Sequence, residues 1–142
     1  MEFATEHRLR NNLEEIQQVV AWLEDFSLRT AIPDSVRNAF DLSLEECLTN
    51  IISYAWNDGL EHWITLRFKH QERPDRVAVE VEDDGREFNP LAVPPVNINV
   101  PLETRSVGGL GIHMIRQIMT NVEYRRQNGR NILTLTKDVP YS

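Results

Sequence analysis

Glu46 and Asn50 are a first pair of residues whose types and spacing could do chemistry together. They are four positions apart, so in a helix they lie on one face while the apolar stripe lies on the other side. The carboxylate could orient or deprotonate a nucleophile, and the amide oxygen could ligate a hard cation such as Mg²⁺. A solvated helix face would carry the same pair, so the pair alone leaves both interpretations open.

A second candidate group follows an alternating apolar segment. Val77, Val79 and Val81 lead directly into Glu82-Asp83-Asp84-Gly85. Carboxylates therefore emerge at the end of a predicted strand, beside a glycine that lets the backbone approach a ligand closely. A carboxylate held in a pocket there could accept a hydrogen bond from an exocyclic amine such as that of adenine. An ordinary acidic turn has the same sequence pattern.

The third candidate is the glycine-rich segment Gly108-Gly109-Leu110-Gly111, which opens a predicted helix. Free N–H groups and the helix dipole favour phosphate at such a position. A flexible hinge is the alternative. The dinucleotide-binding fingerprint is excluded because the preceding residues 85–107 contain four prolines and predict no strand, and a P-loop is excluded because no lysine follows the glycines.

Three helices are predicted, and the second and third contain candidate residues. Asn12 and Glu15 form a candidate capping box ahead of a helix that reaches about Leu28. Pro33 and Gly59 bracket a second helical segment, the one that contains Glu46 and Asn50. The third helix runs over residues 108–120.

Two hairpins are predicted beside the helices, and a short strand is expected before the first helix. The order favours an α+β fold, a two-layer α/β sandwich with helices on one face of a mainly antiparallel, mixed sheet. Residues 85–107 are long for an unstructured connection and are interpreted as a lid. The predicted hairpin strands are residues 64–68 and 77–81, then 122–126 and 131–137 around Asn128-Gly129.

Composition limits the classes of function. The chain has 142 residues, a net charge of −7 and 41% apolar residues, as expected for one soluble domain over residues 1–142. Cys47 is the sole cysteine, which excludes an internal disulfide and a cysteine zinc site. The sequence contains no apolar run near the ~18 residues of a membrane span and no signal-peptide core, so the expected location is the cytoplasm, with no membrane partner.

The charge is unevenly distributed along the chain. Residues 1–62 hold 12 acidic and 4 basic residues, whereas residues 104–137 hold six basic residues and one acidic residue. Overall acidity argues against direct binding of nucleic acid, whose affinity depends on many phosphate contacts. A local basic zone fits a small anion or an acidic protein better.

Taken in this order, the three motifs resemble the ATP-binding domain shared by gyrase, the heat-shock chaperone, histidine kinases and mismatch-repair ATPases, which has the Bergerat-type fold. The sequence is most similar to the small anti-sigma-factor serine kinases. Residues 46–50 resemble their N box, residues 81–90 their first glycine box, residues 108–112 their second, and residues 129–137 their final strand. The resemblance covers about residues 10–137.

The resemblance implies a role for each matching residue. Glu46 matches the general base, Asn50 the Mg²⁺ ligand and Asp83 the carboxylate that recognises adenine. Arg105 could supply positive charge to the γ-phosphate. In one departure, Glu87 stands where sensor kinases usually have a second glycine. The remaining positions around the nucleotide are Gly85, Gly108, Gly109, Leu110 and Gly111.

The function that the resemblance implies is an ATP- and Mg²⁺-dependent protein serine/threonine kinase. It would act as an anti-sigma factor, phosphorylate an antagonist with a sulfate-transporter-like (STAS) fold, bind a sigma factor and form a homodimer. A sensor histidine kinase is disfavoured because only residues 1–11 precede the first predicted helix. Two alternatives stay open: a nucleotide-gated binding module that orders residues 86–107 without phosphotransfer, and a purely structural partner-binding protein.

Overall fold

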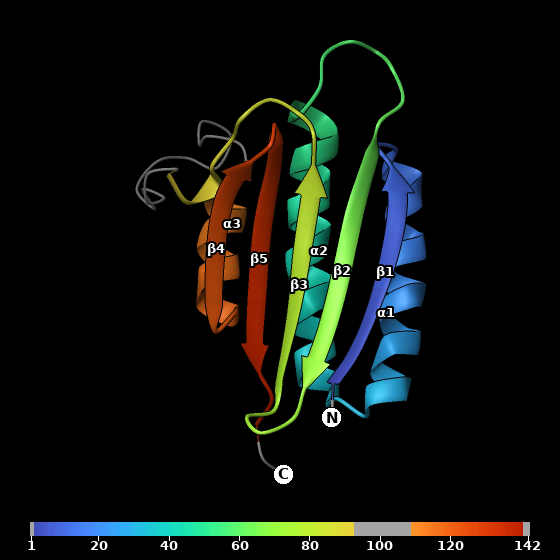
Figure 1. Cartoon of the computed structure of the whole chain (residues 1–142), viewed down its shortest axis with the longest axis vertical. Coiled ribbons are helices and arrows are strands. Elements are labelled where there is room, and N and C mark those ends of the chain that lie inside the picture. Colours follow the sequence, from blue (N-terminus) through green and yellow to red (C-terminus); the bar gives the residue numbers. More distant parts are fainter. Residues whose placement is uncertain (1, 93–108, 141–142) are drawn as a thin grey trace.

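The fold consists of one five-stranded sheet with three helices packed on one face (Figure 1). This computed structural model describes residues 2–92 and 109–140. The strands follow the order β1-β2-β3-β5-β4, and each neighbouring pair is antiparallel. The strands are β1 (Glu2–Arg10), β2 (Trp63–Gln71), β3 (Arg76–Asp83), β4 (Asn121–Gln127) and β5 (Arg130–Asp138); the helices are α1 (Ile16–Thr30), α2 (Asp34–Tyr54) and α3 (Gly109–Ile118).

The predicted α+β class and two-layer architecture are confirmed, with two differences in the sheet. All four described strand pairs are antiparallel, so the sheet is not mixed. The strand expected to be short, β1, has nine residues and pairs with β2 along its whole length. The full length of β1 was not predicted because its sequence is polar, and an edge strand tolerates charged side chains.

The helix boundaries differ in detail. Residues Leu13–Glu15 form a 3₁₀ turn, and α1 continues to Thr30, where Ala31 adopts a left-handed φ of 56° and ends it. The predicted capping box is only half formed. Asn12 accepts a hydrogen bond from the N–H of Glu14, but the Glu15 carboxylate accepts one from the N–H of Arg10.

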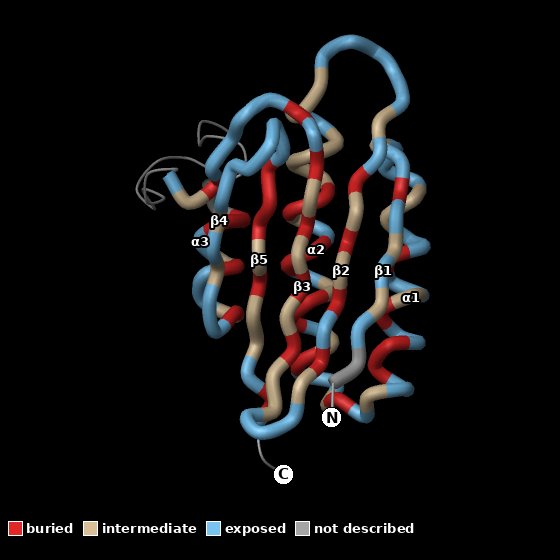
Figure 2. The backbone as a smooth tube through the Cα atoms, in the orientation of Figure 1, coloured by how far each residue is buried: buried red, intermediate tan, exposed pale blue. Residues whose placement is uncertain are grey.

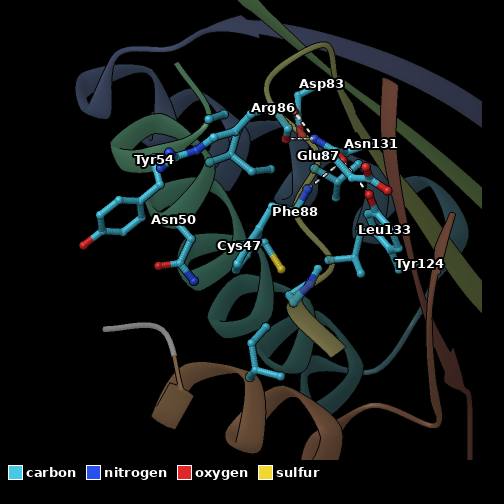
Figure 3. A pocket seen from close by; sticks show the side chains of 15 residues that line it. Cys47, Asn50, Tyr54, Asp83, Arg86, Glu87, Phe88, Tyr124, Asn131 and Leu133 are labelled. Atoms are coloured by element: carbon cyan, nitrogen blue, oxygen red, sulfur yellow. Dashed lines mark hydrogen bonds between the residues drawn. The ribbon is translucent and has the colours of Figure 1, made fainter. Parts of the chain in front are cut away.

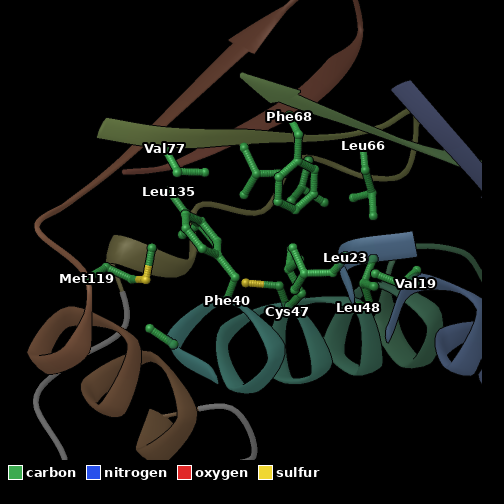
Figure 4. Packing of buried hydrophobic residues seen from close by; sticks show 14 of the residues in the cluster. Val19, Leu23, Phe40, Cys47, Leu48, Leu66, Phe68, Val77, Met119 and Leu135 are labelled. Carbon is green, nitrogen blue, oxygen red and sulfur yellow. The ribbon is translucent and has the colours of Figure 1, made fainter. Parts of the chain in front are cut away.

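The core lies between the sheet and the helices, where alternating strand residues meet the apolar stripes of α1 and α2 (Figure 2). Phe68 of β2 is central, since its ring lies 5.7 Å from that of Phe40 of α2 between centroids (Figure 4). It also lies 5.1 Å from the ring of Phe26 of α1. Buried aromatic rings supply large apolar area and fixed geometry. This packing joins α1 and α2 to β2.

The strand order places the end of β3 beside the beginning of β5. In this antiparallel pair, Asp83 stands opposite Asn131. The loop that follows β3 contains a 3₁₀ turn at Pro90–Ala92, and the rest of the predicted lid, residues 93–107, lies outside the described residues. Within residues 2–92 and 109–140, no helix is long and apolar enough to cross a membrane.

Candidate functional site

A cavity of about 550 Å³ opens between the C-terminal half of α2, the end of β3, α3 and the β4–β5 hairpin (Figure 3). Its volume is in the range of small-molecule sites, and most of its wall is apolar. Its lining residues are Cys47, Asn50, Ile51, Tyr54 and Ala55 of α2 and its end, Val81 and Asp83 of β3, Arg86, Glu87, Phe88 and Pro90 of the following loop, Ile112 of α3, and Tyr124, Asn131 and Leu133 of the hairpin.

Two of the sequence-predicted site residues line this cavity, and three more (Glu46, Gly85 and Gly111) are next in sequence to residues that do. Asn50 and Asp83 lie in its wall. Gly85 contacts the Asp83 carboxylate, and the Glu46 side chain lies against Gly111. Gly109 and Leu110 form the first residues of α3, whereas Gly108 and Arg105 lie outside the described residues.

Asp83 supplies a buried carboxylate at the floor of the cavity. Only 3% of the residue is exposed. Its Oδ1 atom accepts hydrogen bonds from the Gly85 N–H at 2.9 Å and from the Asn131 side-chain amide at 3.0 Å. Burial raises the pKa of Asp83, and these two bonds partly oppose the increase because they stabilise the charged form. The arrangement presents a hydrogen-bond acceptor to a ligand in a largely apolar space.

Gly85 lets the loop after β3 pack tightly on the end of α2. A Cβ atom there would lie 2.5 Å from the Ala55 Cβ and 2.7 Å from the Ala55 carbonyl oxygen. That carbonyl accepts a hydrogen bond from the Arg86 N–H at 3.0 Å. The Trp56 indole N–H also donates to the Asp84 carboxylate at 3.1 Å. The position of Asp83 is therefore fixed by α2 as well as by β5.

Glu46 lies beside the beginning of α3. A Cβ atom on Gly111 would overlap the Cγ, Cδ and Oε1 atoms of Glu46. The first N–H groups of a helix have no intrahelical acceptor, so the Glu46 carboxylate is next to the position where α3 can bind an anion. Asn50 is one turn further along α2 and faces the cavity (Figure 3).

The donor set is compatible with Mg²⁺ held mainly by a bound phosphate. In the described part of the chain, no three His, Cys, Asp or Glu side chains gather closely enough to hold a metal ion by themselves. Mg²⁺ typically keeps water and takes one or two protein ligands together with substrate phosphates. The Asn50 amide oxygen in the cavity wall is of a type that could serve as such a ligand.

Replacing Gly111 with alanine should lower the rate of the phosphotransfer expected from the sequence while leaving the fold intact. The added methyl group would overlap the Glu46 side chain from Cγ to Oε1, so this side chain must adopt another rotamer, and we expect a loss of stability of about 1–3 kcal/mol. Displacement of the carboxylate by about 1 Å should lower the rate by about 100-fold. Urea unfolding and a phosphotransfer assay measure the two effects, and an unchanged rate would contradict this placement of Glu46.

The residues at or beside the cavity that the sequence analysis did not assign to the site include Asn131, Tyr124 and Arg126. The Asn131 side chain bonds to the Tyr124 hydroxyl at 2.6 Å and to the Arg126 guanidinium at 3.1 Å. Arg126 also donates to the Gly85 carbonyl at 2.8 Å. The sequence signal for Asn131 was weak: it is an asparagine near the start of a strand that is otherwise mainly apolar and rich in threonine. The adjacent turn explains an asparagine at this position equally well.

Comparison with known proteins identifies the family of this fold. The histidine kinase-like ATPase domain matches residues 9–137. The chain belongs to the histidine kinase-like ATPase family. It is 30% identical over 115 residues to the serine/threonine-protein kinase BtrW of Bordetella bronchiseptica, an alignment that covers 81% of this chain and 80% of BtrW. These ATPases use ATP, and the relatives within the family are protein kinases by name.

A second curated relative is the serine-protein kinase RsbW of Bacillus mycoides, 30% identical over 96 residues, which cover 65% of this chain and 58% of that protein. Among solved structures, the RsbU and RsbW domains of a Mycobacterium tuberculosis protein match 96% of this chain and 32% of that one, with a TM-score of 0.70 and 13% identity. At that identity the match supports the fold alone.

Proposed function

We propose that this protein is an ATP- and Mg²⁺-dependent serine/threonine kinase that acts as an anti-sigma regulatory factor in the cytoplasm. Its protein substrate would be a STAS-type antagonist, and its second partner a sigma factor. The observation that carries the proposal is the pairing of Glu46 with the start of α3 at one side of a cavity whose floor holds the buried carboxylate of Asp83. The kinase names of the relatives favour the same reaction.

Each residue has a defined part in the proposed reaction. Asp83 accepts a hydrogen bond from the exocyclic amine of adenine, and the N–H groups at the start of α3 bind the phosphates. Asn50 ligates Mg²⁺, which neutralises phosphate charge when bound. Glu46 orients the substrate hydroxyl and accepts its proton. The hydroxyl oxygen bonds to the γ-phosphorus, the bond to the β–γ bridging oxygen breaks, and ADP leaves.

A nucleotide-gated module without phosphotransfer is the second candidate. It is favoured by one observation: Glu87 lines the cavity at the position where sensor kinases usually have a glycine. An acidic side chain in the cavity wall repels phosphate and alters the space available to the nucleotide. Such a protein would still bind ATP and switch partners.

Phosphotransfer by the wild-type chain separates the two candidates. The protein is incubated with γ-labelled ATP and a STAS-domain protein from the same genome, with Mg²⁺ or with excess EDTA. The kinase proposal predicts label on a serine or threonine of the partner only when Mg²⁺ is present. Thermal stabilisation by Mg·ATP without transfer would favour the switch, and no stabilisation at millimolar nucleotide would contradict both.

A further inference from the structure

Asn131 lies at the centre of a hydrogen-bond network that the proposed reaction does not use. It is 7% exposed, is the second residue of β5 and stands directly opposite Asp83. Its Nδ2 group donates to the Asp83 Oδ1 atom at 3.0 Å and to the Arg86 carbonyl oxygen at 2.8 Å. Both amide protons are therefore directed to acceptors on the strand and loop that carry the predicted base-recognition carboxylate.

The carbonyl side of the same amide meets only donors. Asn131 Oδ1 accepts from the Tyr124 hydroxyl at 2.6 Å, from Arg126 Nη1 at 3.1 Å and from the Phe88 N–H at 3.3 Å. Because acceptors lie on one side and donors on the other, the amide has one satisfied orientation. Asparagine is the residue type that can satisfy both sides at this position.

This orientation determines which oxygen of Asp83 is available to a ligand. The Asn131 amide and the Gly85 N–H both end on Oδ1. Within the described part of the chain, both hydrogen bonds to the Asp83 carboxylate are accepted by Oδ1 and none by Oδ2. Asp83 also lines the cavity. The network thus uses one carboxylate oxygen for positioning and leaves the other as the acceptor.

We propose that Asn131 is a positioning residue that sets base selectivity: it fixes the Asp83 carboxylate and the loop 85–88 so that the cavity accepts a base carrying an exocyclic amine and rejects one carrying a carbonyl oxygen there. This inference rests on the proposed binding of adenine by Asp83. When the buried Asp83 oxygen faces a carbonyl oxygen of the base, both are hydrogen-bond acceptors and both stay unpaired. This cost allows strong discrimination between the two kinds of base.

The test compares ADP with inosine diphosphate, which carries the same phosphates but an oxygen in place of the amine. Dissociation constants are measured by calorimetry for wild type and for two variants, Asn131→Ala and Asn131→Asp. The aspartate variant keeps the side-chain volume and the acceptor for Tyr124, but it replaces the amide donor with a second carboxylate beside Asp83. Asn121→Ala, at an exposed asparagine of the same hairpin, is the matched control.

We expect both Asn131 variants to bind ADP about tenfold or more weakly, with little change for inosine diphosphate, so that the selectivity ratio falls toward one. The control should keep the wild-type ratio. Equal loss of both ligands would assign Asn131 a purely structural role and overturn the proposal. Wild-type ADP affinity in the Asn131→Asp variant would overturn it as well, because that variant preserves packing.

A measurement without nucleotide distinguishes this inference from the proposed function. In the unliganded protein, amide hydrogen exchange at Gly85 and Phe88 should be faster in Asn131→Ala than in wild type, because the bonds that hold both amides depend on Asn131. If the wild type does not bind ADP but exchange increases, the proposed function fails while the positioning role stands. Unchanged exchange at both amides would refute the positioning role itself.

Discussion

Replacing Glu46 with glutamine should lower the rate of phosphotransfer by about a hundredfold to ten-thousandfold, the range typical for loss of a general base. The amide keeps the size of the side chain, so its contact with Gly111 is preserved. It cannot accept the proton of the substrate hydroxyl. Because the glutamine removes a negative charge beside the proposed phosphate-binding start of α3, the affinity for ADP should not fall. The two quantities are measured separately, by transfer of labelled phosphate and by calorimetry.

The neighbouring residue offers a matched control for Glu46. Glu45→Gln makes the same chemical change one position earlier in α2, at an exposed side chain away from the cavity. We expect this variant to transfer phosphate at the wild-type rate. If Glu46→Gln is as active as Glu45→Gln, then Glu46 is not the base, and its carboxylate serves only to pack against α3.

Local patterns predicted the elements of this fold because each element is defined by residues close together in the sequence. The alternation of Val77, Val79 and Val81 fixes a half-buried strand, and the Asn128-Gly129 turn fixes a hairpin. The strand order β1-β2-β3-β5-β4 could not be predicted in the same way. The strand order depends on which strands pair when the chain collapses. The sequence of the β4–β5 hairpin does not show which of its two strands pairs with β3.

The same distinction applies to the candidate site. Asp83 and Gly85 were predicted because a carboxylate and a glycine adjoin within one turn, and Glu46 and Asn50 because they share one helix face. Asn131 acts from 48 positions away through its register with Asp83. No local pattern contains a contact of this kind, so the network was found only when β3 and β5 were placed side by side.

Replacing Asp83 with asparagine should weaken ADP binding by about a hundredfold or more, while leaving the unliganded protein at least as stable as wild type. The asparagine Oδ1 atom can still accept the two bonds from Gly85 and Asn131. Its amide group then occupies the place of the free carboxylate oxygen, so a donor faces the adenine amine, which is also a donor. A buried mismatch of this kind is strongly unfavourable.

The stability half of this prediction follows from the pKa of Asp83. Burial raises it above 3.8, so the folded state binds this proton more tightly than the unfolded chain does. Ionising Asp83 therefore reduces wild-type stability as the pH rises from 3.8 through the folded-state pKa, and the penalty is complete above that pKa. Asparagine carries no such penalty. The stability advantage of Asp83→Asn should be largest near pH 7 and should shrink as the pH falls toward 3.8.

Urea unfolding of wild type and variant between pH 7 and pH 4 measures this difference directly. Asp84→Asn is the matched control, because Asp84 is exposed and an asparagine there can still accept the Trp56 hydrogen bond. The control should bind ADP normally and show no pH-dependent advantage. If Asp83→Asn instead loses stability at neutral pH, the ionised carboxylate contributes net stability to the fold.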